Sequence, residues 1–222
     1  MSTRTDIRRS PVSRRLANAQ RAAAATSESD SRVRLADLSL RPRWGLKGRD
    51  VFTFLAAKGA QNPRTDHRAM RQPDGSVIAR FSPGEALILA PPGDGGSSLG
   101  NAVESVPSSG QGACYPVPRR DSHCWFAIVG AAAPAMFAKL CGVDLSPDRF
   151  ADGAIAQTSV ARLSAIVIRH DVADMLAFFL LAETASAEYL WDCLDDAMKE
   201  FEGRVEDADA IWPAAEVQGT SQ

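Results

Sequence analysis

The chain has 222 residues, 45% of them hydrophobic, which is enough for one domain with tails or for two small lobes. Its 25 basic and 27 acidic residues give a net charge of −2, so the composition does not favour nucleic acid as a partner. No hydrophobic run reaches the roughly 18 residues that a membrane span requires, so no membrane partner is expected either.

The cysteines are spaced too irregularly for a C-x-x-C motif, and most of them lie in hydrophobic runs. They are Cys114, Cys124, Cys141 and Cys193. This usage is typical of buried, reduced thiols, and it predicts a cytoplasmic protein.

Residues 1–35 form an Arg/Ala/Ser-rich segment with almost no large hydrophobic side chain. Such a segment cannot bury enough surface to offset its ordering entropy, so we predict a disordered tail. A transit peptide of mitochondrial type has a similar composition, and an arm that orders on an acidic partner is a further alternative. The Arg8-Arg9 pair lacks the hydrophobic stretch of a twin-arginine export signal.

Residues 36–105 give the first half of the predicted domain. Trp44 and Leu46 indicate a short strand, and Asp50 can cap a helix that ends before Gly59. After a polar loop over residues 62–75, two strands are predicted around a Pro83-Gly84 turn. A short helix over residues 99–103 completes this half.

Residues 119–202 give the second half, with the same order of elements. A strand over residues 124–129 leads to a helix that starts near Pro134 and stops at Gly142. A second strand is predicted over residues 160–168, with a bulge around residues 162–164, and turns at His170-Asp171. The third strand, over residues 176–182, is hydrophobic on both faces, as a central strand should be.

The last predicted element is an amphipathic helix. Its hydrophobic stripe is Tyr189, Leu190, Cys193, Leu194, Ala197, Met198 and Phe201. Residues 203–222 then form an acidic segment that we predict to be flexible. Residues 36–202 are therefore expected to make a single α+β domain of two pseudo-repeated β-α-β-β-α halves, each with a mixed sheet and helices on one face.

No residue pattern indicates catalysis or metal binding. His67 and His170 are predicted to be exposed in loops, and His123 next to Cys124 has no second pair of ligands at metal-binding spacing. Asp195 and Asp196 are neighbours on a helix and point in different directions. We therefore predict no catalytic, cofactor-binding or metal-binding residues in this chain.

The charged segment before residues 124–129 is the best candidate for a functional surface. It contains Arg119, Arg120, Asp121 and His123. A loop at the end of a strand holds its side chains at a fixed place, and adjacent arginines suit the recognition of carboxylates. These four residues form either a solvated loop with local ion pairs, such as one to Asp121, or a contact with another subunit; the contact is the functional prediction.

Three segments of the second half, RRDSHCWFAIVG, MFAKLCGVDL and QTSVARLSAIVIR, carry a family resemblance. They resemble the gamma (small) subunit family of heterotetrameric sarcosine oxidase and of related N-methyl amino acid dehydrogenases. The resemblance covers residues 35–202, and in the first third it consists of a G-x-D-x-x-x-F-L pattern. It implies a fold similar to the folate-binding domain of glycine cleavage aminomethyltransferases.

The resemblance implies a non-catalytic subunit of a complex that demethylates sarcosine to glycine by oxidation and passes the one-carbon unit to tetrahydrofolate. The expected partners are the alpha, beta and delta subunits, with FAD, FMN, NAD, tetrahydrofolate and zinc on those subunits. One alternative is the small subunit of an N-methylglutamate or other N-methyl amine dehydrogenase. The other is a freestanding folate-binding protein of the same fold.

Overall fold

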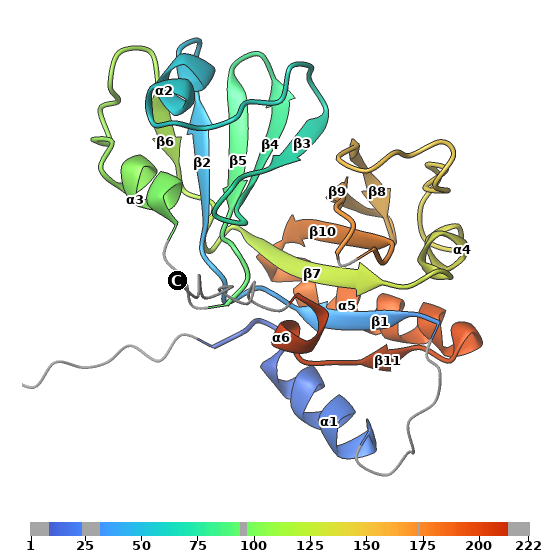
Figure 1. Ribbon diagram of the computed structural model, residues 1–222. Coiled ribbons are helices and arrows are strands. Elements are labelled where there is room, and N and C mark those ends of the chain that lie inside the picture. The colour runs from blue at the N-terminus through green and yellow to red at the C-terminus, as the bar shows by residue number, and fades with distance from the viewer. Residues whose placement is uncertain (1–8, 24–31, 94–96, 173, 213–222) are drawn as a thin grey trace, which may run out of the picture.

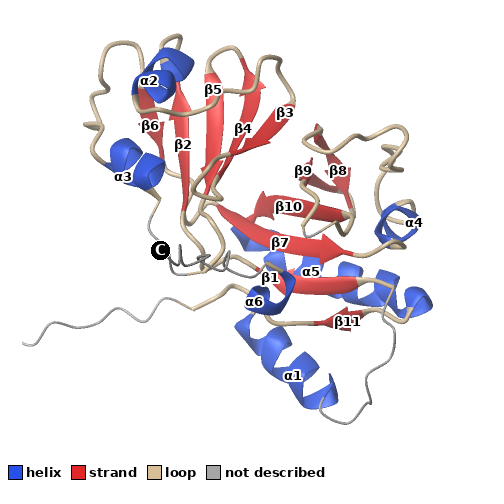
Figure 2. Cartoon of the chain, viewed as in Figure 1, coloured by secondary structure: helices blue, strands red, loops and turns tan. Residues whose placement is uncertain are grey.

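The computed structural model describes residues 9–23, 32–93, 97–172 and 174–212. Within these residues the chain forms two β-sheets that pack on one another, with helices on the outer face of each (Figure 1, Figure 2). This is the α+β architecture that the sequence predicts. No helix in these ranges is long and hydrophobic enough to cross a bilayer.

The larger sheet, here sheet A, has six strands. In spatial order they are β11 (Arg204–Val205), β1 (Arg34–Asp37), β7 (His123–Val129), β10 (Ala177–Glu183), β9 (Leu163–Arg169) and β8 (Ile155–Val160). Neighbours are antiparallel except β1 and β11, which run parallel and make the sheet mixed. As predicted, β10 lies between two strands with both faces buried, and its Phe179 pairs with Ala127 and Ile168.

The smaller sheet, sheet B, has five antiparallel strands. In spatial order they are β3 (Arg68–Arg71), β4 (Val77–Ser82), β5 (Glu85–Leu89), β2 (Arg43–Lys47) and β6 (Tyr115–Val117). The predicted Pro83-Gly84 turn joins β4 to β5. The register of this pair shifts by one residue at Phe81, because Arg80 faces Ala86 whereas Ser82 faces Glu85.

The two halves of the chain repeat the same order of elements, as the sequence indicates, but each half has one more strand than expected. The helices of the repeat are α2 (Val51–Ala57), α3 (Ser98–Glu104), α4 (Ala133–Phe137) and α5 (Ala187–Met198). The order β2-α2-β3-β4-β5-α3 is matched by β7-α4-β8-β9-β10-α5. The additional strands are β3 and β8, both at sheet edges, where exposed polar residues hide the hydrophobic alternation of a strand.

The prediction of one bulged strand over residues 160–168 is wrong. The chain turns back at Ala161 and Arg162, which have φ angles of 48° and 66°, so β8 and β9 form a hairpin. A two-residue turn with both φ angles positive is normally made by Asn-Gly or Asp-Gly. Neither Ala161 nor Arg162 is one of these residue types, so a turn could not be predicted at this place.

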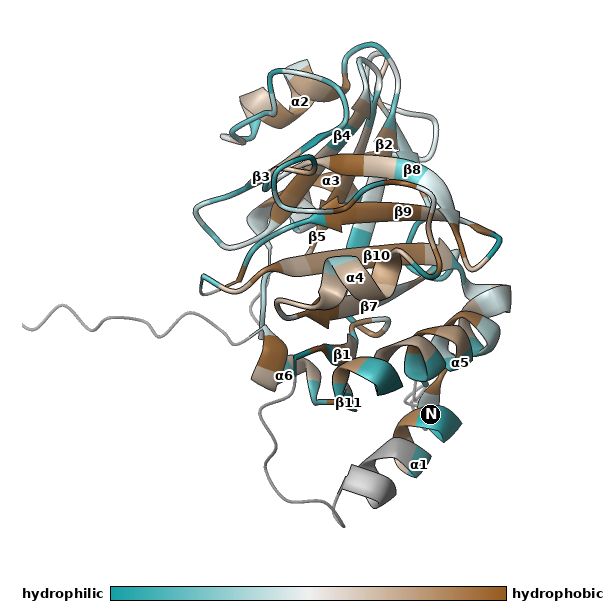
Figure 3. Cartoon of the chain, turned by 90° about the vertical axis from the view of Figure 1, so that its right-hand side faces the viewer, coloured by the Kyte–Doolittle hydropathy of each residue, from teal (hydrophilic) through white to brown (hydrophobic). Residues whose placement is uncertain are grey.

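Three hydrophobic clusters make the layers of the molecule. The first lies between sheet A and α5 and includes Cys124, Phe126 and Leu194; the second lies between the two sheets and includes Trp125 and Phe179. The third lies between sheet B and helices α2 and α3. Figure 3 shows the hydrophobic colouring along β9 and β10, whereas α5 carries residues of both kinds.

The predicted disordered tail over residues 1–35 is corrected for its described part. Residues Ser13–Ala23 form helix α1, which packs near β11 below sheet A (Figure 1). Val12 is fully buried, the Ser10 hydroxyl donates to Asp37, and the Arg15 guanidinium donates two hydrogen bonds of 2.8 and 2.9 Å to Asp192. This packing depends on few hydrophobic side chains, so composition alone could not reveal it. Residues 1–8 and 24–31 lie outside the described residues.

The end of the chain also differs from the predicted flexible segment over residues 203–222. After the 3₁₀ turn η2 (Lys199–Phe201), strand β11 joins β1, and helix α6 (Ala208–Ile211) packs against sheet A. Trp212 is buried, and its ring centroid is 5.5 Å from that of Trp125 and 4.8 Å from that of Phe179. Residues 213–222 lie outside the described residues.

Helix α5 faces sheet A as predicted, with two exceptions. Leu190, Leu194 and Met198 are buried, but Tyr189 is 52% exposed, and the buried Trp191 is absent from the predicted stripe. The cysteines behave as expected, since Cys114, Cys124 and Cys141 are buried and none of the four is in a disulfide.

Candidate functional site

The loop of residues 118–122, called the functional loop below, contains the predicted residues Arg119, Arg120 and Asp121 and crosses from one sheet to the other. It links β6 at the edge of sheet B to β7 in the middle of sheet A (Figure 1). Thr184, in the 3₁₀ turn η1 (Thr184–Ser186) after β10, holds the loop in place. Its hydroxyl donates to the Asp121 carbonyl at 2.8 Å, and its backbone N–H donates to the Ser122 carbonyl at 3.1 Å.

Arg119 lies between the two sheets and is engaged in an ion pair. Its Nη2 is 2.8 Å from Oε1 of Glu85, and the two side chains are 22% and 23% exposed. Gly45 on β2 allows this position, because a Cβ there would lie 2.7 Å from Cγ of Arg119 and 2.8 Å from the Val117 carbonyl oxygen. The arginine is therefore positioned by the sheet and does not reach freely into solvent.

His123 faces the same space between the sheets. Along β7, alternate residues point to opposite faces, so His123 shares a face with Trp125, whereas Cys124 points towards the helices. Burial, together with the positive charges of Arg119 and Arg43, lowers the pKa of His123 to about 4. The imidazole is neutral at pH 7, and its Nδ1 lies 2.8 Å from the Ser122 hydroxyl.

The structure also separates His123 from the thiol that follows it in the sequence. Burial raises the pKa of Cys124 to about 11, and its thiol donates to the Ala182 carbonyl at 3.4 Å. A nucleophilic cysteine needs a thiolate and a base within reach. These two adjacent residues therefore do not form a Cys-His dyad.

Arg119 and His123 line a cleft of about 480 Å³ between the sheets, called the inter-sheet cleft below. Its other lining residues are Phe81, Glu85, Gln157, Thr158, Ser159, Ser164, Ala165, Ile166 and Leu181. They come from the β4–β5 turn, the β8–β9 hairpin and β10. The cleft is thus the end of the core between the sheets that opens to the surface.

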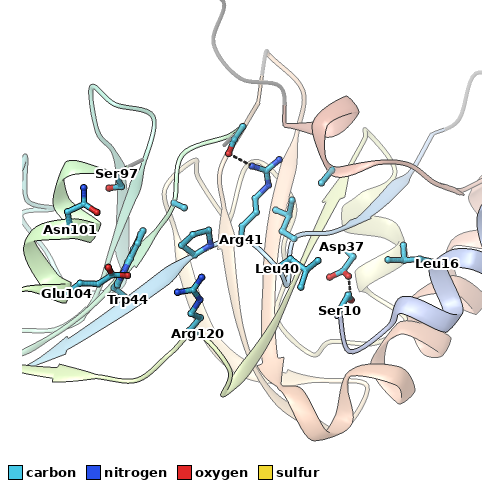
Figure 4. Close-up of a pocket in the computed structure, with 15 residues that line it drawn as sticks. Ser10, Leu16, Asp37, Leu40, Arg41, Trp44, Ser97, Asn101, Glu104 and Arg120 are labelled. Atoms are coloured by element: carbon cyan, nitrogen blue, oxygen red, sulfur yellow. Dashed lines mark hydrogen bonds between the residues drawn. The ribbon is translucent and has the colours of Figure 1, made fainter. Parts of the chain in front are cut away.

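Arg120 and Asp121 are both exposed on the loop. Arg120 is exposed and lines a groove of about 520 Å³, in which it lies between Trp44 and Leu40 (Figure 4). The Trp44 indole donates to Glu104 at 2.8 Å, and Leu40 is 48% exposed. A smaller depression of about 200 Å³ is lined by Arg120, Asp121 and His123 together, and another is lined by both Arg119 and Arg120. The structure therefore keeps the four predicted residues close together around this loop, and their contact with another subunit stays a prediction.

The remaining candidates do not form a catalytic group. His67 is exposed, as predicted, but His170 is only 5% exposed and packs against Phe179 and Trp212, so its predicted exposure is wrong. Asp195 and Asp196 lie 3.8 and 3.3 Å from Nζ of Lys199 on the outer face of α5. No three His, Cys, Asp or Glu side chains of the described residues are placed to hold a metal ion.

Sequence reasoning missed Glu85, Gly45 and Phe81 as parts of the site. One signal was present, because a glycine inside a strand indicates that another group approaches the backbone closely. Gly45 lies inside the Trp44–Leu46 strand that the sequence predicts, and the group that approaches it is the Arg119 side chain.

Comparison with known proteins identifies the fold. No protein-family model matches the chain, and no curated protein matches it. Among solved structures, it is similar to a chain of the heterotetrameric sarcosine oxidase from Corynebacterium sp. U-96, determined in complex with pyrrole 2-carboxylate. The TM-score is 0.71 at 22% identity, and the match covers 89% of this chain and 97% of that chain.

A second similar structure is glycine cleavage system aminomethyltransferase T from Bartonella henselae. Here the TM-score is 0.56 at 14% identity, with 80% of this chain and 48% of the transferase chain covered. This chain therefore corresponds to about half of that enzyme. The predicted fold, that of the folate-binding domain of glycine cleavage aminomethyltransferases, is confirmed.

Proposed function

We propose that the chain is the small, non-catalytic subunit of a heterotetrameric oxidoreductase of the sarcosine oxidase type. The observation that carries the proposal is the extent of the structural match. It covers 89% of this chain and 97% of one chain of such an oxidase, so the two chains share a fold over nearly all of their lengths, and this supports the proposal.

In this proposal the complex demethylates an N-methyl amino acid by oxidation, with sarcosine as the first substrate to test, and transfers the one-carbon unit to tetrahydrofolate. The alpha, beta and delta subunits would bind FAD, FMN, NAD, tetrahydrofolate and zinc, in the cytoplasm. The chain itself would support the assembly.

The exposed part of the functional loop at Arg120 is the part of the chain that fits a subunit contact best. Arg120 is exposed beside a concave groove, and the exposed Leu40 offers a hydrophobic anchor in the same groove. A basic residue beside an exposed leucine is the mixture of charge and apolar surface that protein interfaces use. Arg119 is less suitable, because its side chain is only 22% exposed.

The test is purification of the tagged chain from its native host, with identification of the proteins that copurify and an activity assay over N-methyl amino acids. The informative variant is Arg120→Glu, since reversing Arg119 would place two carboxylates side by side at Glu85 and disturb folding. We expect Arg120→Glu to melt as the wild type does and to lose its partners. Arg64→Glu, at another exposed arginine, is the matched control and should keep them.

Two results would contradict the proposal. If the wild-type chain purifies without any flavin-containing subunit, it is not part of such a complex. If Arg120→Glu retains full assembly, the groove is not the contact. A chain that purifies alone and binds tetrahydrofolate would instead support the freestanding folate-binding alternative, which the similarity to aminomethyltransferase T favours.

A further inference from the structure

The inter-sheet cleft has the build of a small-molecule site. Its volume of about 480 Å³ lies within the range of roughly 300–1,000 Å³ that is usual for ligand pockets. Its floor is hydrophobic and consists of Phe81, Ile166 and Leu181, and an adjoining apolar depression adds Leu87. A ligand there would cover the hydrophobic end of the core between the two sheets.

Phe81 reaches this floor through an irregularity in sheet B. The β4–β5 pairing shifts by one residue between Arg80 and Ser82, which is a β-bulge at Phe81. Bulges redirect a side chain and are frequent beside functional sites. The ring is 5% exposed and forms a wall that a ligand can contact.

The charged wall of the cleft is positioned by the backbone of sheet B. The Arg119 side chain passes over Gly45, where any Cβ would meet it at 2.7 Å, and its guanidinium pairs with Glu85 at 2.8 Å. A guanidinium has five N–H donors, so this pair leaves donors for a second carboxylate. Lys47, 3.6 Å from the other oxygen of Glu85, can keep that carboxylate paired when Arg119 turns to a ligand.

The opposite wall is polar and uncharged. Gln157 and Ser159 come from β8, which is the edge strand of sheet A, and Ser164 lies across the hairpin from Ser159. Amide and hydroxyl side chains both donate and accept hydrogen bonds. His123, between the two walls, adds a ring nitrogen to this set.

We propose that the inter-sheet cleft binds a small organic carboxylate that carries an apolar group next to the carboxylate and an amide or hydroxyl group beyond it. The carboxylate pairs with Arg119, the apolar group lies on Phe81 and Leu181, and the polar group bonds to the β8 wall. The proposal concerns the full-length chain by itself and does not depend on its assembly with other subunits.

N-acetyl-leucine has these three groups and is the probe, titrated into the full-length chain and followed by NMR. We expect saturable shifts of the backbone amides of Gln157, Ser159 and Ser164, which line the cleft. N-acetyl-leucinamide, which lacks only the charge, should bind at least about tenfold more weakly, because it loses the hydrogen bonds of a charged group. A short peptide ending in leucine distinguishes a chain terminus from a free small molecule as the source of the carboxylate.

Two variants should change the affinity in opposite directions. Arg119→Gln should weaken N-acetyl-leucine binding about tenfold or more, whereas Glu85→Gln should strengthen it, because the ligand no longer competes for the guanidinium. A purely structural effect would weaken binding in both. Arg149→Gln, at an exposed arginine outside the cleft, is the control and should have no effect.

The proposal is overturned by any of three results. These are no saturable shifts at millimolar N-acetyl-leucine, equal binding of N-acetyl-leucinamide, or equal affinity of the wild type and Arg119→Gln. Melting temperatures of both variants are measured alongside. If Arg119→Gln does not fold, the direction of the Glu85→Gln effect decides, and weaker binding in that variant refutes the proposal.

Discussion

Acid should weaken the fold through one buried histidine, and removing that histidine should remove the effect. His170 lies at the end of β9, with its ring centroid 5.3 Å from Phe179 and 6.2 Å from Trp212, and its Nε2 has no hydrogen-bond partner among the described residues. Burial lowers the pKa of His170 to about 4, although the nearby carboxylates of Asp152 and Asp171 oppose the shift.

The expected loss of stability follows from linkage. The folded pKa of about 4 is below the unfolded value of about 6.5, so the unfolded chain binds the proton more tightly. The stabilising contribution of neutral His170 is complete above about pH 6.5 and is lost as the pH falls through about 4. At about 1.4 kcal/mol per pH unit the whole effect is about 3 kcal/mol, of which about 2 kcal/mol is lost by about pH 5.

The measurement is urea denaturation of the wild type and of His170→Leu at about pH 7.5 and at about pH 5. Leucine fills a similar volume and does not titrate. The free energy of unfolding of the wild type should fall by about 2 kcal/mol more than that of the variant. Since His123, whose pKa is also lowered, is present in both proteins, its effect cancels in this comparison. Equal pH dependence of the two proteins, or a His170 ring that titrates near pH 6.5 in the folded state, would refute the reasoning.

Three further predictions concern the packing. Leu194→Asp places a carboxylate in the buried face of α5 and should lower the free energy of unfolding by about 3–5 kcal/mol. Tyr189→Asp, on the exposed face, should leave the melting temperature almost unchanged. Similar melting temperatures of the two variants would contradict the assigned faces. Val12→Asp should lower stability by about 2 kcal/mol or more, because Val12 is fully buried, and an unchanged melting temperature would mean that residues 9–23 do not pack on the domain. Replacing Arg162 by Gly should raise the free energy of unfolding by about 1 kcal/mol, since Arg162 is exposed and has a positive φ; a lower melting temperature would contradict the hairpin.

The sequence predicted those elements whose hydrophobic pattern is continuous. The strands β7 and β10 and the helix α5 are read directly from runs such as residues 124–129, because burial on both faces or on one stripe leaves a clear period. The edge strands β3 and β8 were missed for the opposite reason, since no residue of β3 is buried and only the two end residues of β8, Ile155 and Val160, are buried. A turn without glycine at Ala161-Arg162 has no local signature at all.

The candidate site was only partly predictable. The charge and the strand-end position of Arg119 and His123 are visible in the sequence, but the inter-sheet cleft that they line depends on the strand alternation and on the crossing of the loop between the sheets. Glu85 is distant in the sequence and becomes the partner of Arg119 only when β5 and β2 pair. The burial of His170 depends on Trp212, which folds back from the end of the chain.

The parallel pairing of β1 with β11 has a consequence for how the chain folds. All of sheet B lies in the sequence between β1 and β7, so it can form from one continuous stretch as the chain leaves the ribosome. Sheet A cannot be completed until Val205 has been synthesised, because the partner of Leu35 is that residue. Closing a loop of about 170 residues costs only about 0.6 kcal/mol more than closing one half as long. Adding β11 therefore costs little free energy at equilibrium, but contacts so distant in the sequence form slowly. We therefore expect sheet B to fold first, while sheet A still has an unpaired edge at β1.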